Sequence, residues 1–148
     1  MVKRLVSFIG AIALVSAAAA AANGPTIVMP SQLQWKAMAG FPGAMVAVVS
    51  GNPTKAGSDY VERYKMPDGM KIPPHFHPAV ENVTVLQGTL MVGLGDKMDA
   101  AKMVALPAGS FVSVPMNLHH YAMAKGVTII QIHGIGPDTI EPVKAAKM

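Results

Sequence analysis

The sequence of 148 residues contains no cysteine. Disulfide bonds are therefore excluded, and the folded chain must be stabilised by packing. Metal sites built from thiolates are excluded as well, and no cysteine stands at a processed N-terminus to carry a lipid. A metal site predicted for this chain has to rely on nitrogen and oxygen ligands.

Aromatic residues (5%) and charged residues (14%) are both scarce. The formal net charge is +4, and half of it comes from Lys3 and Arg4 near the N-terminus. The remaining basic residues are scattered, so the sequence does not predict a nucleic-acid partner. Glycine (14) and proline (12) are plentiful, which favours many short strands joined by tight turns. The length has room for one domain, and we expect it to be all-β.

Residues 1–22 are typical of a secretory signal peptide. Lys3 and Arg4 form a short positive head, residues 5–15 are apolar, and small residues follow. Cleavage is expected after Ala22 or two residues earlier. A membrane anchor is the alternative, because the apolar run is nearly long enough to span a bilayer. Alanine contributes little to insertion, so we expect a periplasmic or secreted protein that meets a membrane only through this leader.

The stretch over residues 69–88 contains a candidate metal site. His75 and His77 are two residues apart, so on a strand both imidazoles leave by the same face. Pro78 then bends the chain, and Glu81 opens the next strand with its carboxylate toward the same site. Two imidazoles and one carboxylate suit Mn, Fe, Co, Ni, Cu or Zn rather than Ca or Mg.

A fourth ligand is predicted in the stretch over residues 109–120. Two short apolar runs meet at Pro115, and Asn117 can take the left-handed conformation that a tight turn requires. His120 would begin the returning strand and point at the site. Its neighbour His119 must point to the opposite face, toward solvent or an interface.

Both stretches resemble the two motifs of the cupin superfamily. The first motif, G-x5-H-x-H-x3-E-x6-G, is filled at every fixed position by Gly69, His75, His77, Glu81 and Gly88. The second, G-x5-P-x-G-x2-H-x3-N, is matched by Gly109, Pro115 and His120. Asn117 replaces the turn glycine and Ala124 the final asparagine. The resemblance implies one divalent transition metal ion (Fe, Mn, Ni, Cu or Zn) bound by His75, His77, Glu81 and His120.

The same resemblance implies a double-stranded β-helix, the jelly-roll barrel of cupins, over residues 44–134. Residues 23–43 would form an N-terminal arm that adds a strand or contacts a second subunit of a homodimer. Residues 135–148 would form a C-terminal tail. Within the barrel we expect four strands besides those that carry the ligands. Residues 44–50 form an apolar strand buried on both faces, and residues 60–66 form a strand that alternates charged and apolar residues. Residues 89–94 pair with the strand that begins at Glu81, and residues 127–134 form the last long strand.

Cupins with this ligand set include dioxygenases, oxalate-degrading enzymes, isomerases, lyases and binding proteins. We expect a metal-dependent oxidoreductase of the dioxygenase type that acts on a small organic acid or phenol. Glu81 would also serve catalysis by carrying a proton. The alternatives are a non-catalytic module that binds metal or a small ligand, and a structural dimer with a vestigial site. The pocket floor is predicted from Val83, Val85, Phe111 or Val112, and Ala122.

Four further polar residues have open roles. Arg63 either reaches the pocket or lies on a solvated face. Gln131 and His133 share one face of their strand, so they either support the site or form a surface pair. Tyr121 is the fourth polar group that could serve an enzyme at this site.

Overall fold

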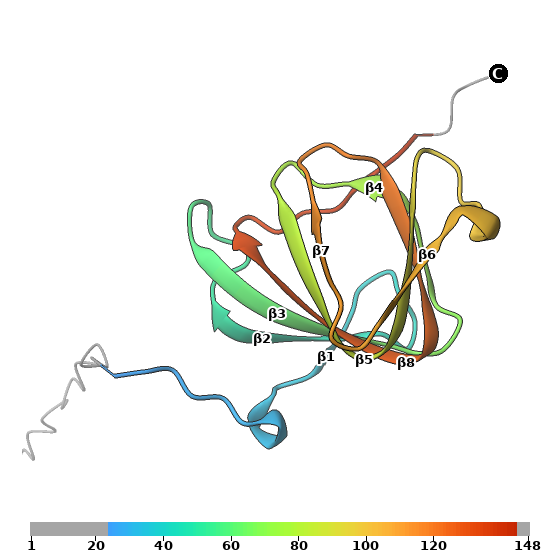
Figure 1. The fold of residues 1–148 in the computed structure, drawn as a ribbon. Coiled ribbons are helices and arrows are strands. Elements are labelled where there is room, and N and C mark those ends of the chain that lie inside the picture. Colours follow the sequence, from blue (N-terminus) through green and yellow to red (C-terminus); the bar gives the residue numbers. More distant parts are fainter. Residues whose placement is uncertain (1–23, 145–148) are drawn as a thin grey trace, which may run out of the picture.

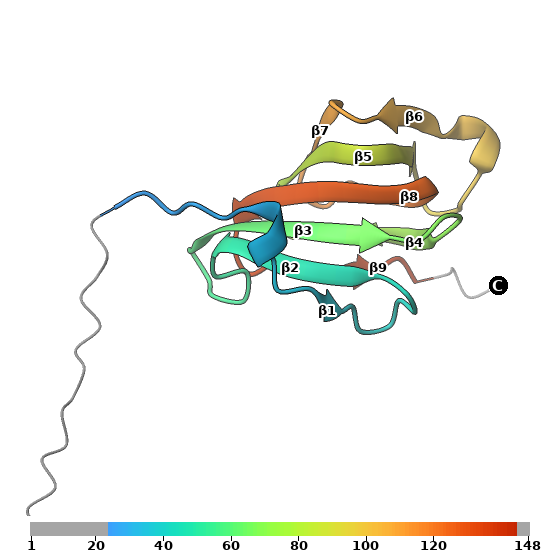
Figure 2. The same cartoon turned by 90° about the horizontal axis from the view of Figure 1, so that it is seen from below.

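The computed structural model describes residues 24–144. The predicted signal peptide lies outside the described residues, so it stays a prediction. Within the described part of the chain, no helix is both long and apolar enough to cross a membrane. Residues 24–33 run away from the rest of the fold in Figures 1 and 2.

The described residues form one sheet of nine strands, which curls into a barrel (Figure 1). Its strands are β1 (Lys36–Ala37), β2 (Met45–Gly51), β3 (Asp59–Met66), β4 (Lys71–Phe76), β5 (Glu81–Leu94), β6 (Val104–Pro107), β7 (Phe111–Val114), β8 (His120–Ile135) and β9 (Glu141–Pro142). Two short 3₁₀ helices, η1 (Pro30–Gln32) and η2 (Ala100–Lys102), lie outside the sheet.

Strand β8 organises the barrel. It pairs with β5 along one edge, and with β4 and β3 along the other, always antiparallel. Figure 2 shows β5, β8 and β3 side by side, with β6 beyond β5 and β2 beyond β3. Strands from distant parts of the sequence are thus neighbours in the sheet.

In two places the sequence predicted two consecutive strands where the structure has one continuous strand. Residues 81–94 form one strand, with register shifts around Gln87 against β8. Gly88 lies in this irregular stretch with a φ of 72°. An irregularity of this kind bends a strand without ending it, which explains why turn residues did not mark a boundary. In the same way, β8 continues through Gly126 instead of stopping before residues 127–134.

Strand β2 corrects another prediction. Its apolar sequence suggested burial on both faces, but Val48 is 49% exposed while Ala47 is buried. The reason is that the outer face of the sheet is open to solvent here, so side chains of β2 alternate between a buried inner face and an exposed outer face. The segment before residue 44 supplies β1, and the tail after residue 134 supplies β9, which pairs with β4. Both flanking segments therefore contribute strands to the sheet.

The core lies on the inner face of β3, β5 and β8. Alternate residues point inward along these strands, as the period of a strand requires. The buried cluster consists of Tyr60, Met66, Val83, Val85, Leu90, Ala122, Ala124, Ile130 and Ile132. Many of these side chains also line an interior cavity, so the core and the candidate site share one face of the sheet.

Candidate metal centre

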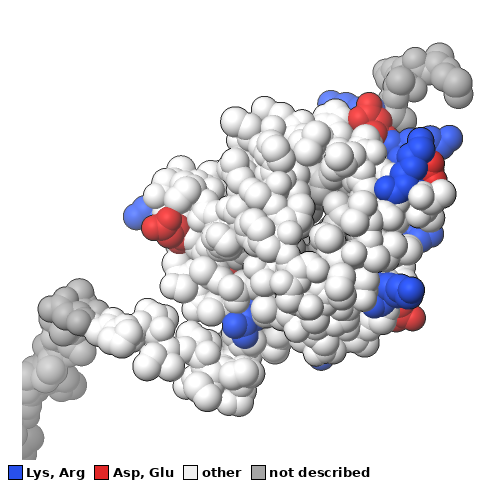
Figure 3. Space-filling view, in the orientation of Figure 1, with Lys and Arg blue, Asp and Glu red and all other residues white. Residues whose placement is uncertain are grey.

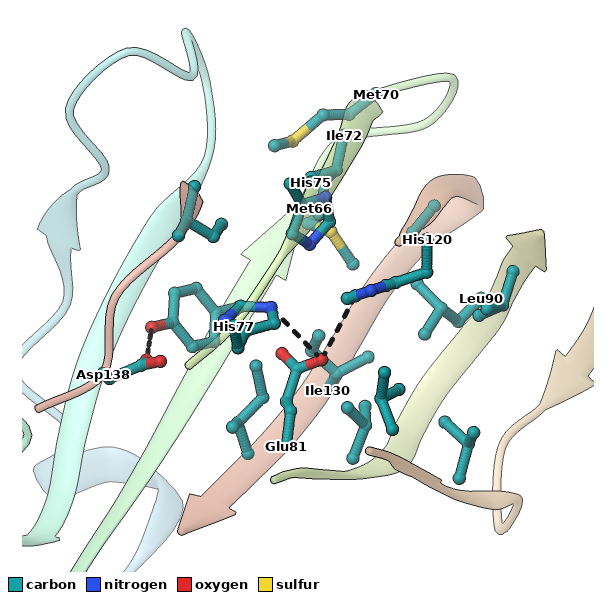
Figure 4. A pocket seen from close by; sticks show the side chains of 18 of the residues that line it. Met66, Met70, Ile72, His75, His77, Glu81, Leu90, His120, Ile130 and Asp138 are labelled. Atoms are coloured by element: carbon teal, nitrogen blue, oxygen red, sulfur yellow. Dashed lines mark hydrogen bonds and ion pairs between the residues drawn. The ribbon is translucent and has the colours of Figure 1, made fainter. Parts of the chain in front are cut away.

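Three strand ends bring the four predicted ligands together. His75 lies near the end of β4, Glu81 begins β5 and His120 begins β8, while His77 follows β4 directly. His75 and His120 are direct partners in the β4–β8 register. All four residues are buried, and Figure 4 shows the contacts of His77 and His120 with Glu81. The site thus forms where the two motif stretches meet across the antiparallel pairing.

The spacing of the ligand atoms fits a metal ion. Each of the three histidines offers one ring nitrogen as a possible metal ligand, and these three nitrogens lie within 4.8 Å of one another. Oε2 of Glu81 lies 3.5 Å from Nε2 of His77 and 3.5 Å from Nε2 of His120. Atoms that each bind one ion at about 2.1 Å lie about 3 Å apart at a right angle and about 3.4 Å at the tetrahedral angle. The two Glu81 distances match such a ligand shell.

Hydrogen bonds to backbone carbonyls fix the tautomer of each imidazole. The Nδ1 atoms of His75, His77 and His120 lie 2.7, 2.8 and 3.0 Å from the carbonyl oxygens of Pro73, Thr139 and Leu118. A carbonyl only accepts, so each Nδ1 carries a hydrogen, and in the neutral form of each ring the lone pair lies on Nε2. Metal-binding histidines are held in this manner.

One buried atom supports the metal assignment directly. Nε2 of His77 is buried and has no hydrogen-bond partner. Buried polar atoms without a partner are rare, and each one calls for an explanation. A lone pair aimed at a metal position supplies that explanation, so the residues present fit a bound transition metal ion.

Burial and neighbouring charges set the ionisation of the site. Burial lowers the pKa of His75 to about 4, so this ring is neutral at physiological pH. For Glu81, burial raises the pKa, but His120 and His77 outweigh that effect and the pKa ends below its usual value. Burial lowers the pKa of His120, yet the adjacent Glu81 carboxylate raises it more. Glu81 is therefore a carboxylate, the form that binds metal.

The four residues lie in the wall of a cavity of about 200 Å³. Of the predicted floor, Val83, Val112 and Ala122 line this cavity. Val85 is buried in the core without lining it, and Phe111 is 58% exposed. Of the two alternatives Phe111 and Val112, it is thus Val112 that lines the cavity. The other lining side chains are mostly aliphatic or methionine, and no Lys or Arg is among the described lining residues.

None of the four open polar residues lines the cavity. Ile130 and Ile132 point inward from β8, so Gln131 and His133 point outward, and Gln131 accepts a 3.0 Å hydrogen bond from Nε of Arg63. This corrects the idea that Arg63 reaches the pocket. Tyr121 is fully buried, but its hydroxyl donates to the Asp99 carbonyl instead.

His119 points away from the site, as the alternation of a strand predicts. Its ring contacts Asp96 and stacks on Phe76 with 5.1 Å between ring centroids. Its side chain is 38% exposed, whereas that of the neighbouring His120 is 5% exposed. The two adjacent histidines therefore offer a natural comparison between a predicted metal ligand and a partly exposed residue.

The sequence interpretation missed two polar residues that do line the cavity, Tyr64 and Asp138. The Tyr64 hydroxyl lies 3.0 Å from Oδ2 of Asp138 and 3.0 Å from Oε2 of the buried Glu62. The sequence could have predicted that Glu62 and Tyr64 point inward, because they alternate along β3 in phase with the inward residues Tyr60 and Met66. No local pattern marked Asp138, which joins the site from the tail.

Comparisons with known proteins identify the fold. Residues 63–132 match the protein family described as Cupin domain. No curated protein matches the chain. Two solved structures are similar to it, the polyketide cyclase RemF from Streptomyces resistomycificus (TM-score 0.67, 14% identity, 84% of this chain and 89% of that chain) and an RmlC-like cupin from Shewanella frigidimarina (TM-score 0.60, 16% identity, 78% and 93%).

A third similar structure is described as a DMSP lyase (TM-score 0.61, 15% identity, 76% of this chain and 63% of that chain). At these identities the structures establish the fold alone. The predicted all-β, double-stranded β-helix is thereby confirmed. The comparisons leave the ligand, the metal and the reaction to be argued from the site itself.

Proposed function

We propose, from the premise that this chain carries a cupin domain, that it is a metal-dependent enzyme acting on a small organic ligand, with dioxygenase-type oxidation as the leading reaction. The observation behind the proposal is the convergence of three imidazole Nε2 atoms and the Glu81 carboxylate in the wall of an apolar cavity. A bound divalent ion would supply Lewis acidity and, if it is redox-active, activation of dioxygen.

The cavity narrows the class of ligand. Its lining is apolar apart from the four predicted ligands, Tyr64 and Asp138. A carboxylate ligand would meet no cationic side chain there, so only the bound metal ion would balance its charge. Figure 3 shows charged side chains mainly at the edges of the visible face. The apolar lining favours a ligand with an apolar ring, such as a phenol, and a volume of about 200 Å³ favours one small ring.

A non-oxidative reaction at the same site is the second candidate. It is favoured by Tyr64, Glu62 and Asp138, which place groups able to carry protons beside the ligand space. It is also consistent with similar structures named as a cyclase and a lyase. Glu81 would bind metal in both reactions and would carry a proton if it leaves the metal during turnover.

The first test measures metal in untagged protein recovered from outside the cytoplasm. The parent should hold about one equivalent of a transition metal, and the variant carrying His75→Ala with His120→Ala should hold almost none. The matched control carries His119→Ala with His133→Ala, which removes two imidazoles that do not face the site. Equal metal loss in both double variants, or an empty parent, would refute the metal-dependent proposal.

The second test follows the reaction of the loaded protein with a panel of monohydric and dihydric phenols. Dioxygen uptake that matches product formation would support the oxidoreductase. Product formation that is independent of dioxygen would support the second candidate. Ligand binding without any product would leave a non-catalytic binding module, the alternative expected for some cupins.

We further propose that this chemistry takes place after export, because residues 1–22 have the composition of a signal peptide. Outside the cytoplasm, intrinsic affinities favour Cu and Zn over Mn and Fe unless the site opposes that order. Mass spectrometry of the recovered protein should show an N-terminus at or near Asn23. A recovered chain that retains Met1 would count against export by cleavage.

A further inference from the structure

Three polar side chains in and behind the cavity wall have no part in the metal centre: Glu62 and Tyr64 on β3, and Asp138 on the tail. We call them the acid trio. The Tyr64 hydroxyl lies 3.0 Å from Oε2 of Glu62 and 3.0 Å from Oδ2 of Asp138. Figure 4 shows Asp138 and its dashed bond on the His77 side of the cavity. Tyr64 and Asp138 line the cavity, whereas Glu62 lies behind them with 6% of its surface exposed.

The two contacts of the Tyr64 hydroxyl need a second hydrogen in the acid trio. A phenol has one hydrogen to donate. If both carboxyl groups were ionised, Tyr64 could donate to only one of them. The other carboxylate oxygen would then face the phenol oxygen with no hydrogen between them, in a site where an unmade hydrogen bond is costly. Both hydrogen bonds form together only when one carboxyl group is protonated and donates to the Tyr64 oxygen.

Glu62 is the carboxyl group that suits this role. It is almost completely buried, and burial penalises the charged form. The titratable groups around it are Tyr60, Tyr64 and Asp138, and none of these brings a positive charge. Burial, with a further contribution from Asp138, raises the pKa of Glu62 to about 6 although the Tyr64 hydrogen bond lowers it. Arg63 is turned toward Gln131 on the outer face of the barrel.

We propose that the acid trio is the acid–base group of the cavity, in which Glu62 stores a proton and Tyr64 transfers it to an oxygen atom of the bound ligand. As the O–H bond to the ligand forms, the Tyr64 O–H bond breaks and the Glu62 proton restores the phenol. Glu62 ends as the carboxylate, and the reverse sequence removes a proton from the ligand. No oxidant or reductant is needed.

This role rests on the proposed function, and it refines the class of ligand. Tyr64 is the catalytic residue of the trio, since it lines the cavity. Asp138 is a positioning residue, because its carboxylate holds the Tyr64 hydroxyl beside the ligand. A ligand served by this group must change protonation at an oxygen, as a phenol or an enolisable ketone does.

The charge of the acid trio can be measured without metal or turnover. At about pH 5, where an exposed glutamate is mostly ionised, Glu62→Gln should leave the electrophoretic mobility of the folded protein nearly unchanged. The matched control, Glu141→Gln, replaces an exposed glutamate and should shift the mobility by almost one charge. A shift of the same size for Glu62→Gln would overturn the stored proton.

A second measurement keeps the inference testable if Glu62→Gln does not fold. The chain has three glutamates, Glu62, Glu81 and Glu141, so carbon NMR of labelled glutamate gives few carboxyl signals. One signal of the native protein should titrate at about pH 6. If all three titrate at or below the ordinary glutamate value of about 4.3, Glu62 stores no proton.

The catalytic part of the inference is tested in the loaded enzyme. Tyr64→Phe should lower kcat by about 100-fold or more. Glu62→Gln should remove the part of the pH dependence of kcat that follows the ionisation of Glu62. Tyr121→Phe, which alters a buried tyrosine outside the cavity, should leave both unchanged. Full activity of Tyr64→Phe would refute the role of the trio. A parent without metal or turnover would refute the proposed function while the charge measurement still reports on the proton.

Discussion

The pKa of His75 illustrates how burial shapes the site at the scale of a residue. In the unfolded chain this imidazole has a pKa of about 6.5, whereas burial lowers it to about 4 in the folded state. The unfolded chain therefore binds a proton first as the pH falls. It follows that His75 lowers the stability of the metal-free protein progressively between about pH 6.5 and pH 4.

This effect should appear as a difference between the parent and His75→Gln. Between about pH 7 and pH 4, the free energy of unfolding of the metal-free parent should fall by about 3 kcal/mol more than that of the variant. The comparison largely cancels His120, whose raised pKa acts in the opposite direction. Urea unfolding in the presence of a chelator measures both proteins. Parallel pH dependences would contradict the buried, neutral state of His75.

The site residues differ in how far the sequence alone predicts them. His75, His77 and Glu81 follow from spacing along the chain, because the period of a strand fixes their directions. His120 required the second motif, since its contact with the first depends on strand pairing. Asp138 was unpredictable in this way, because it meets Tyr64 across 74 positions of the chain. Such a contact depends on how the tail folds back.

At the scale of an element, Gly88 lets β5 bend and continue. Its φ is +72°, and a Cβ atom there would lie 2.6 Å from the Val127 carbonyl oxygen of β8. Gly57 has the same φ of +72°, but a Cβ atom there would have no other heavy atom within 4 Å, so it is a matched control. Gly57→Ala should cost about 1 kcal/mol for its backbone conformation alone.

Gly88→Ala should cost at least about 3 kcal/mol, because it adds a clash with the backbone of β8 to the same conformational cost. Chemical denaturation of the two variants beside the parent measures the difference. Equal destabilisation would show that β5 and β8 separate easily here. A larger destabilisation by Gly88→Ala than by Gly57→Ala would explain why position 88 needs glycine although the strand continues past it.

The C-terminal tail is the second element that the site needs. The Thr139 carbonyl accepts the hydrogen bond from Nδ1 of His77, and β9 pairs with β4 beside His75. Ending the chain after Pro137 should therefore weaken zinc binding by about 10- to 100-fold, the usual cost of losing the partner of a ligating histidine. Competition with a chromogenic chelator measures the affinity.

Thr139→Ala is the control for this truncation. It keeps the main-chain carbonyl that His77 uses, so its zinc affinity should equal that of the parent. If the truncated protein binds zinc as tightly as the parent, the tail does not orient the ligand. If Thr139→Ala weakens binding as much as truncation, the threonine side chain has a role that its hydrogen bonds do not explain.

At the scale of the whole molecule, the sequence predicted the architecture better than the individual strands. Abundant turn residues and the motif resemblance led to the barrel. The continuity of β5 and β8 was missed, because a glycine with positive φ looks the same in sequence whether it ends a strand or bends it. The exposure of Val48 was missed because an uninterrupted apolar run does not show which face of its strand the folded sheet turns to solvent.

Because the chain has no cysteine, no disulfide bond can cross-link its strands, whereas coordination of a metal ion can. The predicted ligands lie at β4, β5 and β8 or directly beside them, so a bound ion ties three strands of the barrel together. Metal binding to the folded state alone raises the free energy of unfolding by about 2.7 kcal/mol at 100 times the dissociation constant. For a domain of this size, that is a rise of roughly 10 °C in Tm.

Thermal unfolding with different ions therefore tests the site through the whole molecule. Zinc or nickel should raise the Tm of the chelator-treated parent by roughly 10 °C, whereas calcium and magnesium, which prefer oxygen ligands, should have little effect. His77→Ala should abolish the shift, because it removes a buried Nε2 aimed at the metal position. His133→Ala removes an exposed imidazole and should keep it. A shift that survives in His77→Ala, or one equally large with calcium, would mean that the ion acts elsewhere on the chain.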